Sequence, residues 1–257
     1  MDTSQIDDYG KLMGPNYKKR LENLNAGERI EDAGKKNPTD FALWKFNLTG
    51  KKRDMEWESP RGIGFPGRHI ECSAMSSEYL GEQFDIHHGG IEHVTVHHSD
   101  EIAQSECAFG KKPWVKYWVH NALLQIDGGK MGKSLGNAYT LKDIAEKGFS
   151  PLDLRYFFFM AQYGSFQNFT RRALEQAKKT RENLQKKIGK IAPLMKGGAE
   201  GGGFGAMKGA LVDQIDEAMK DNLNTPKLLT LVNNVVNNPN EDELAVLYRL
   251  EKTILRV

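Results

Sequence analysis

The sequence predicts an α/β protein with a parallel sheet in its first half and helices in its second half. Apolar runs such as FDIHHGG and KYWVHNALLQI alternate with helical segments between residues 68 and 126. Alternation of this kind is typical of a parallel sheet. After residue 150 the apolar residues recur at helical spacing instead. In parallel sheets the loops that follow the strands carry the ligand site, so we expect the functional residues there.

The first half divides into short elements. Pro and Gly in GKKNPTD (34–40) and WESPRGIGFPG (57–67) exclude long helices or strands before residue 68. HIECSAMSSEYLG then predicts the end of a strand followed by a helix, and FDIHHGG a short buried strand broken by glycines. HHSDEIAQSECAFG predicts a helix closed by Gly110, and Lys116–Ile126 predicts a second strand.

The second half is helical. Thr140 followed by Asp143 predicts a capped helix start. Five apolar residues then share one helical stripe, namely Leu174, Ala177, Leu184, Ile188 and Ile191. The glycine-rich stretch Lys196–Gly205 predicts a flexible linker. A turn at Asn222–Asn224 and a helix with Thr225 as N-cap and Pro226 at its first position follow.

Composition limits the class of protein. A chain of 257 residues can form one large domain or two modest ones, and 39% hydrophobic with 27% charged residues predicts a soluble globular chain. No apolar run approaches the roughly 20 residues of a membrane span, and the N-terminus does not read as a secretory signal. Two cysteines cannot form a disulfide framework, which suits a reducing, cytoplasmic location.

Basic residues concentrate between positions 171 and 190. This stretch contains eight basic residues (Arg171, Arg172, Lys178, Lys179, Arg181, Lys186, Lys187 and Lys190) and two acidic ones (Glu175 and Glu182). The excess suits a polyanionic partner such as a nucleic acid. A solvated helix face explains the charges equally well.

The stretch IDGGKMGKSLGN (126–137) nearly spells a phosphate-binding P-loop. The pattern requires a glycine at position 127, where Asp127 stands, and a helix directly after the serine, where Leu-Gly-Asn follows. The P-loop interpretation therefore fails. The stretch remains a glycine-rich loop with two lysines, Lys130 and Lys133, which can neutralise phosphate charge or form an ordinary basic turn.

His97 and Glu101 stand four residues apart on a predicted helix, so their side chains share one face. An imidazole and a carboxylate at this spacing can bind one zinc ion, and Cys72 could add a thiolate. The alternative is an accidental surface pair. Cys107, six residues after Glu101, falls on another face, and we interpret it as a small buried residue.

His87-His88-Gly89-Gly90 ends a predicted strand. Glycine has no Cβ, so an adenine or ribose ring could approach the backbone here. Two glycines after a strand are also a common turn.

Several segments together resemble the cysteinyl-tRNA synthetases, which are class I synthetases. They are PGRHIECSAM, FDIHHGGIEH, HHSDEIAQSE, WVHNALLQIDGGKMGKSLGN and DLRYFFFMAQYGSFQNFT, with DYGKLMG, NPTDFALWK and DEAMKDNLNTPKLL more loosely. The resemblance implies the second half of a class I Rossmann-like parallel sheet followed by an α-helical domain. It implies four parts: a remnant of the connective insertion (1–40), a catalytic half with zinc ligands (41–126), the lysine loop and connecting region (127–170), and a truncated tRNA-binding helical domain (171–257).

The resemblance also implies site roles. Cys72, His97 and Glu101 match three of four zinc ligands, and the zinc of that family binds the thiolate of the substrate L-cysteine. Five positions match ATP-binding residues (His87, Gly89, Gly90, Glu92 and Lys133), and His87 matches a histidine near the amino-acid pocket. Lys130 and Lys133 match the catalytic lysines that stabilise the transition state when cysteine attacks ATP, a substrate used with Mg²⁺. tRNA(Cys) is the implied acceptor.

The sequence also departs from the family pattern. Residues 1–257 contain no His-x-Gly-His signature and no fourth zinc-ligand cysteine. Arg68 replaces a tryptophan, His88 a glycine, Glu92 an aspartate and Gly132 a serine. We therefore expect an incomplete cysteine–tRNA ligase, with trace activity alone and an N-terminal half from another chain. The alternatives are a cysteine ligase of thiol (amino-sugar) biosynthesis and a non-catalytic zinc- or tRNA-binding paralogue.

Overall fold

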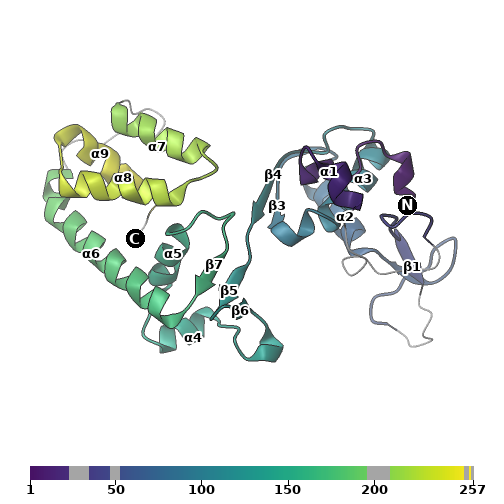
Figure 1. The fold of residues 1–257 in the computed structure, drawn as a ribbon, viewed down its shortest axis with the longest axis horizontal. Coiled ribbons are helices and arrows are strands. Elements are labelled where there is room, and N and C mark those ends of the chain that lie inside the picture. Colours follow the sequence, from purple (N-terminus) through teal and green to yellow (C-terminus); the bar gives the residue numbers. More distant parts are fainter. Residues whose placement is uncertain (23–34, 47–52, 196–208, 252–254, 256–257) are drawn as a thin grey trace. The chain divides into compact units, whose positions relative to one another are not determined.

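The computed structural model describes residues 1–22, 35–46, 53–195, 209–251 and 255. The chain forms two compact units, Met1–Asn121 and Ala122–Val257, each with its own core. Figure 1 shows the elements of both units. In the part that the structure describes, no helix is both long and apolar enough to cross a membrane.

The first unit contains a parallel strand pair with two helices beside it. Strand β3 (Phe84–Gly90) pairs with β4 (Val115–Asn121) in parallel, with His87 opposite Trp118. Helices α2 (Arg68–Leu80) and α3 (His97–Phe109) pack on each other. The remaining elements are the antiparallel pair β1 (Trp44–Phe46) and β2 (Gly64–Pro66), α1 (Tyr17–Glu22), and short 3-10 turns at Thr3–Gln5, Lys11–Met13 and Ile91–His93.

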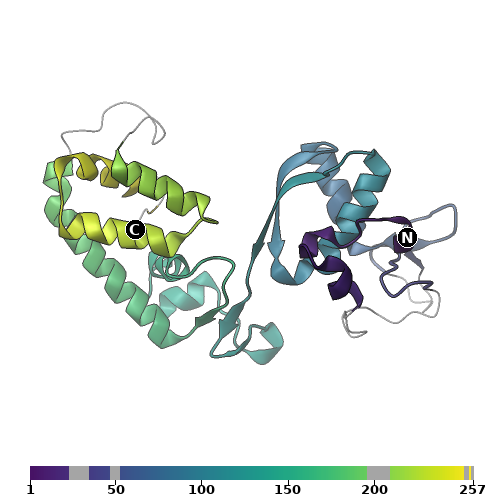
Figure 2. The ribbon, with the colours of Figure 1, turned by 45° about the horizontal axis from the view of Figure 1, so that its top comes forward.

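The second unit is mainly helical around a small sheet. Strand β5 (Leu124–Ile126) lies between β6 (Gly129–Lys130) and β7 (Gln167–Phe169), and it is parallel to β7. The helices are α4 (Leu141–Glu146), α5 (Pro151–Phe159), α6 (Arg171–Met195), α7 (Ala210–Lys220), α8 (Thr225–Asn237) and α9 (Glu241–Leu250). Both ribbon views show α7, α8 and α9 grouped beside α6 (Figures 1 and 2).

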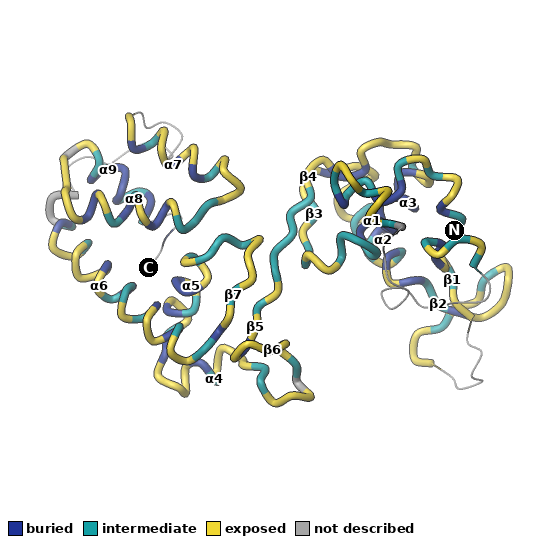
Figure 3. Tube along the Cα trace, in the orientation of Figure 1, coloured by how far each residue is buried: buried dark blue, intermediate teal, exposed yellow. Residues whose placement is uncertain are grey.

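Most predicted elements are confirmed. The strand FDIHHGG, the helix closed by Gly110 and the capped helix after Thr140 are all present, with the Thr140 and Asp143 side chains capping reciprocally. The predicted apolar stripe lies on α6, where Leu174, Ala177, Leu184 and Ile191 are buried and Ile188 packs against the same core. In Figure 3 buried segments recur along α3 in the first unit and along α6 and α8 in the second. The predicted linker Lys196–Gly205 lies outside the described residues.

Three local predictions are wrong. The residues from Arg68 are helical from the start, so Cys72 lies on α2 and not at a strand end, because the buried His69 and Ser73 face α3 at helical spacing. The predicted strand Lys116–Ile126 is two strands, which separate after Asn121 where the first unit ends. The N-cap of α8 is Asn224, whose side chain accepts the Lys227 N–H, and not Thr225.

Candidate metal centre and lysine loop

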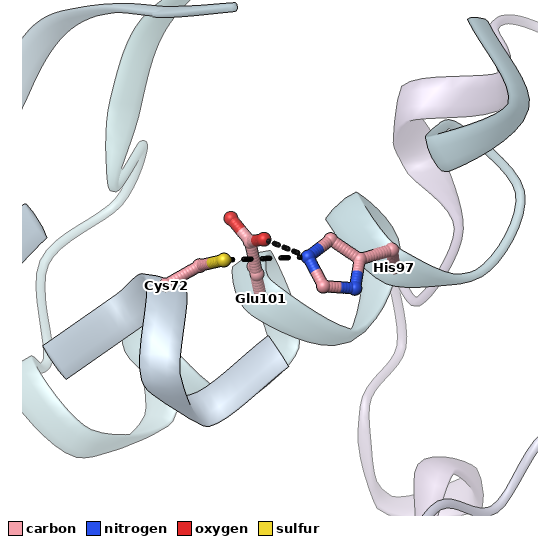
Figure 4. Close-up of side chains that lie close together, drawn as sticks. All are labelled: Cys72, His97 and Glu101. Atoms are coloured by element: carbon pink, nitrogen blue, oxygen red, sulfur yellow. Dashed lines mark hydrogen bonds and ion pairs between the residues drawn. The ribbon is translucent and has the colours of Figure 1, made fainter. Parts of the chain in front are cut away.

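Helices α2 and α3 bring the three predicted metal ligands together. Cys72 Sγ lies 3.5 Å from His97 Nε2, which in turn lies 2.8 Å from Glu101 Oε1 (Figure 4). The three ligand atoms all lie within 4.8 Å of one another. Ligands that share one tetrahedral zinc at about 2.0–2.3 Å are separated by less than about 4 Å, so the arrangement needs little adjustment.

Helix α3 is polar yet buried along residues 98–106. Such a helix is stable only where its polar groups find partners inside the protein. Tyr9 donates its hydroxyl to Asp100 Oδ1 at 2.5 Å, and Lys11 donates to Glu106 Oε2 at 2.7 Å. These partners lie more than 90 positions away in the sequence and fix α3 from the side of the N-terminal segment.

A second network holds α2 against α3. Gln104 Nε2 donates to Ser73 Oγ at 2.6 Å and to the His69 carbonyl at 2.7 Å, and Ser105 donates to Ser73 at 2.9 Å. Ser73 directly follows Cys72, so this network sets the position of the thiol relative to His97. These residues are not evident from the sequence, because their only signal is polar spacing on a helix whose burial the sequence does not reveal.

Glu101 is the exception among the buried carboxylates of α3. Its side chain is 0% exposed, and neither oxygen accepts a well-aligned N–H or O–H hydrogen bond from a described residue; the protonated Cys72 thiol is a weak donor beside it. Its nearest polar neighbours are His97 Nε2 at 2.8 Å and His87 Nε2 at 3.3 Å. A buried carboxylate without donors is costly. A cation bound between Glu101, His97 and Cys72 would remove that cost, so the residues present fit a zinc ion.

The electrostatics of the site also favour a bound cation. Burial and, after it, the negative charge of Glu101 raise the pKa of the Cys72 thiol to about 11. Without a metal the sulfur therefore stays protonated, whereas a metal ligand must be a thiolate. Burial lowers the pKa of His87, which keeps that imidazole neutral.

Cys107 lies outside the metal group, as predicted, but it is exposed and not buried. The burial of α3 ends at Glu106, and its last turn emerges into solvent. Cys107 therefore cannot be the small core residue that the sequence suggested.

Packing within the protein limits the space beside the two glycines of strand β3, strictly at Gly89, which faces the buried His98 ring, and less so at Gly90, which faces the end of the exposed Glu92 side chain. A Cβ on Gly89 would lie 2.5 Å from Cε1 of the His98 ring, and a Cβ on Gly90 would collide with the Glu92 carboxylate. Side chains of the protein thus already occupy the space beside the bare backbone of these glycines. The ATP-binding role of His87, Gly89, Gly90 and Glu92 stays a prediction.

The lysine loop lies in the second unit. It follows a β5–β6 turn in which Asp127 and Gly128 have positive φ, and it continues as a short 3-10 turn, Lys133–Leu135, rather than a helix. Lys130 is exposed. Asn137 spans the loop, since its Oδ1 accepts the Gly132 N–H and its Nδ2 donates to the Lys130 carbonyl, both at 2.9 Å. No motif in the sequence marks Asn137 for this role.

The basic segment of α6 is largely solvent-facing. Six of its eight basic residues are exposed (Arg171, Arg172, Lys179, Lys186, Lys187 and Lys190). Arg181 is buried and donates to Asp153 Oδ1 at 2.8 Å, and Lys178 donates to the Gly148 carbonyl at 2.9 Å. The sequence count therefore overstates the charge available to a partner, because these two residues hold α6 in place.

Comparison with known proteins gives consistent results. Residues 1–179 match the family described as tRNA synthetases class I (C) catalytic domain. The cysteine–tRNA ligase of Treponema denticola is 41% identical over 273 residues, which cover 98% of this chain and 54% of the relative. That of Methanococcus maripaludis is 42% identical, and the aligned region covers 93% of this chain and 50% of the relative. That of Dehalococcoides mccartyi is 48% identical over 70% of this chain and 38% of its own length.

The chain thus spans about half the length of these curated relatives. Among solved structures, the LeuRS in a ternary LeuRS-tRNA-LeuAMS complex from Agrobacterium radiobacter K84 matches 76% of this chain and 31% of its own. Its TM-score is 0.50 at 12% sequence identity, which shows a shared fold alone. With the family match over residues 1–179 and relatives above 40% identity, the chain belongs to the class I tRNA synthetase (C) catalytic-domain family.

Proposed function

We propose that this chain carries the amino-acid-selecting and lysine-loop part of a cysteine–tRNA ligase, which activates L-cysteine with ATP and Mg²⁺ and transfers it to tRNA(Cys). The observation that carries the proposal is the group of Cys72, His97 and Glu101, in which Glu101 is fully buried and has no well-aligned N–H or O–H donor among the described residues. The names of the relatives support the same activity. We place the protein in the cytoplasm, where free thiols such as Cys72 stay reduced.

Cys72, His97 and Glu101 would hold a zinc ion. When bound, zinc supplies a site for a thiolate that a serine hydroxyl fills poorly, and this selects cysteine over a near-isosteric competitor. The protein side chains prepare the site for the ion. Glu101 provides a buried negative charge, and the Gln104–Ser73 network holds the two helices at the distance that the ligands need.

The lysine loop would act on the nucleotide. In the activation step a carboxylate oxygen of cysteine forms a bond to the α-phosphorus of ATP, and the bond from that phosphorus to the pyrophosphate oxygen breaks. Lys130 and Lys133 are assigned to the negative charge that develops on the phosphates, and fixed charges of this kind commonly contribute about 10²–10³ in rate. Asn137 would keep the loop in shape while its lysines contact the phosphates.

The exposed basic residues of α6 would contact the phosphate backbone of tRNA. Backbone contacts add affinity without reading bases, and they weaken with salt. This role favours a tRNA ligase over a cysteine ligase that acts on an amino-sugar, because such an enzyme would have no use for a basic helix.

The test is ATP–pyrophosphate exchange that depends on cysteine. We expect at most trace exchange by residues 1–257 alone, and strong exchange when a segment that carries the His-x-Gly-His signature is supplied from a relative. Serine should not replace cysteine, and zinc removal should abolish the preference for cysteine. Zinc binding without exchange under either condition would indicate a non-catalytic paralogue. Exchange that proceeds without charging of tRNA, but with transfer to an amino-sugar, would indicate the thiol-biosynthesis ligase.

A further inference from the structure

His87 is held rigidly beside the metal group without belonging to it. It lies on β3, and its side chain is 14% exposed. Its ring packs against Trp118 at a centroid distance of 4.6 Å, against His98 at 5.0 Å, and against Phe84 and Trp114 at 5.8 Å each. Aromatic neighbours on several sides leave the ring little freedom to rotate.

The Nε2 atom of this fixed ring points at Glu101. It lies 3.3 Å from Oε2, whereas Oε1 faces His97 at 2.8 Å. The two oxygens of one carboxylate are thus directed to different groups. The metal group of Cys72, His97 and Glu101 does not include His87, which falls in a separate overlapping group with His98 and Glu101. His87 therefore contacts the carboxylate through the oxygen that does not face His97.

We propose that His87 is a positioning residue for Glu101: it donates Nε2–H to Oε2 and leaves Oε1 as the single carboxylate oxygen available to the metal. The 3.3 Å separation is long for a hydrogen bond, and a shift of a few tenths of an ångström on metal binding would close it. Carboxylates that bind metals are commonly oriented by such a hydrogen bond, and its loss typically weakens metal binding about 10–100-fold.

The inference rests on the proposed function, since it requires Glu101 to bind a metal. It differs from a substrate-binding role for His87, because it places the effect of this residue on the metal and not on cysteine or ATP. It also differs from direct ligation in a site formed by His87, His98 and Glu101, which would change the ligand set itself.

The experiment compares His87→Phe, His87→Gln and His88→Phe in the full chain. Phenylalanine keeps a ring among the aromatic neighbours but removes the nitrogen, and glutamine restores a donor. His88 is exposed on the same strand and is the matched control. Zinc affinity is measured by competition with a chromophoric chelator, and the ligand set by the visible spectrum of the Co²⁺ form. Urea unfolding of the metal-free proteins checks that each variant folds.

We expect His87→Phe to bind zinc about 10–100-fold more weakly, His87→Gln to recover most of the loss, and His88→Phe to match the wild type. The Co²⁺ spectrum of His87→Phe at saturation should keep the wild-type sulfur-to-cobalt band and band positions. Zinc affinity of His87→Phe within twofold of the wild type would overturn the inference, and so would a Co²⁺ spectrum showing a lost ligand. Failure of the wild-type chain to bind zinc would overturn the proposed metal site as well.

Discussion

The buried carboxylate of Glu101 should make the metal-free protein less stable than it could be. Because neither oxygen has a well-aligned N–H or O–H donor among the described residues, an amide at this position should remove a desolvation cost of about 1–3 kcal/mol. Glu101→Gln is therefore expected to raise the free energy of unfolding in EDTA. Most substitutions at fully buried sites destabilise, so the direction of this change is diagnostic.

Zinc should reverse the order of stability. A metal that binds only the folded state stabilises it by about 4.1 kcal/mol when its free concentration is 1,000 times the dissociation constant, which exceeds the deficit of about 1–3 kcal/mol. The wild type should gain this increment and Glu101→Gln should lose it. In EDTA the variant is then the more stable protein, and in zinc the wild type is.

Tryptophan fluorescence reports on the unfolding of the first structural unit, which contains Glu101. All four tryptophans (Trp44, Trp57, Trp114 and Trp118) lie in the first unit, so urea unfolding followed by their emission reports on that unit alone. The matched control is Glu106→Gln on the same helix. Its carboxylate accepts from Lys11 Nζ at 2.7 Å and from the backbone N–H of Trp114 at 3.2 Å. This variant should lose about 1–3 kcal/mol with or without zinc.

Two results would refute the reasoning. If Glu101→Gln unfolds at lower urea than the wild type in EDTA, the carboxylate is satisfied within the protein. If the variant keeps the zinc-dependent increment, Glu101 is not a ligand. Glu106→Gln must keep the full zinc-dependent increment and must not gain stability in EDTA, since the Glu106 carboxylate already has donors and lies outside the metal group.

Three further predictions concern other parts of the chain. Arg181→Met should destabilise the second unit by about 3–5 kcal/mol in unfolding followed by far-UV circular dichroism, because it leaves the buried Asp153 carboxylate without its partner. The control Arg172→Met, at an exposed position, should change stability by less than about 0.5 kcal/mol. It should also lower the salt dependence of tRNA binding by about 1 in slope. Asn137→Ala should raise the ATP KM of the complete exchange system about tenfold or more, because the lysine loop loses its internal support; an unchanged KM would exclude that role. Burial raises the pKa of Asp40, but hydrogen bonds from Thr3 and Asn37 outweigh it and lower the value from 3.8 to about 2. The carboxylate thus contributes stability above pH 3.8 that is lost as the pH falls through about 2. In Asp40→Asn the urea midpoint of unfolding should therefore depend less on pH over this acid range than in the wild type.

The sequence predicted the local features well because their determinants lie within a few residues. The pair His97 and Glu101 shares a helix face by spacing alone, and the cap formed by Thr140 and Asp143 involves a separation of three. The apolar period of α6 likewise predicted its buried stripe. Each of these depends on backbone geometry that neighbouring residues fix. The family resemblance also came from linear motifs, and the comparisons confirm it.

Only the tertiary structure decided which polar groups have partners. Tyr9 reaches Asp100 across 91 positions and Arg181 reaches Asp153 across 28, and neither pairing follows from local spacing. The sequence could not show that Arg181 is a buried structural residue, nor that Glu101 alone among the carboxylates of α3 lacks a well-aligned N–H or O–H donor. Whether a charge is satisfied depends on everything packed around it, and packing is a property of the folded chain.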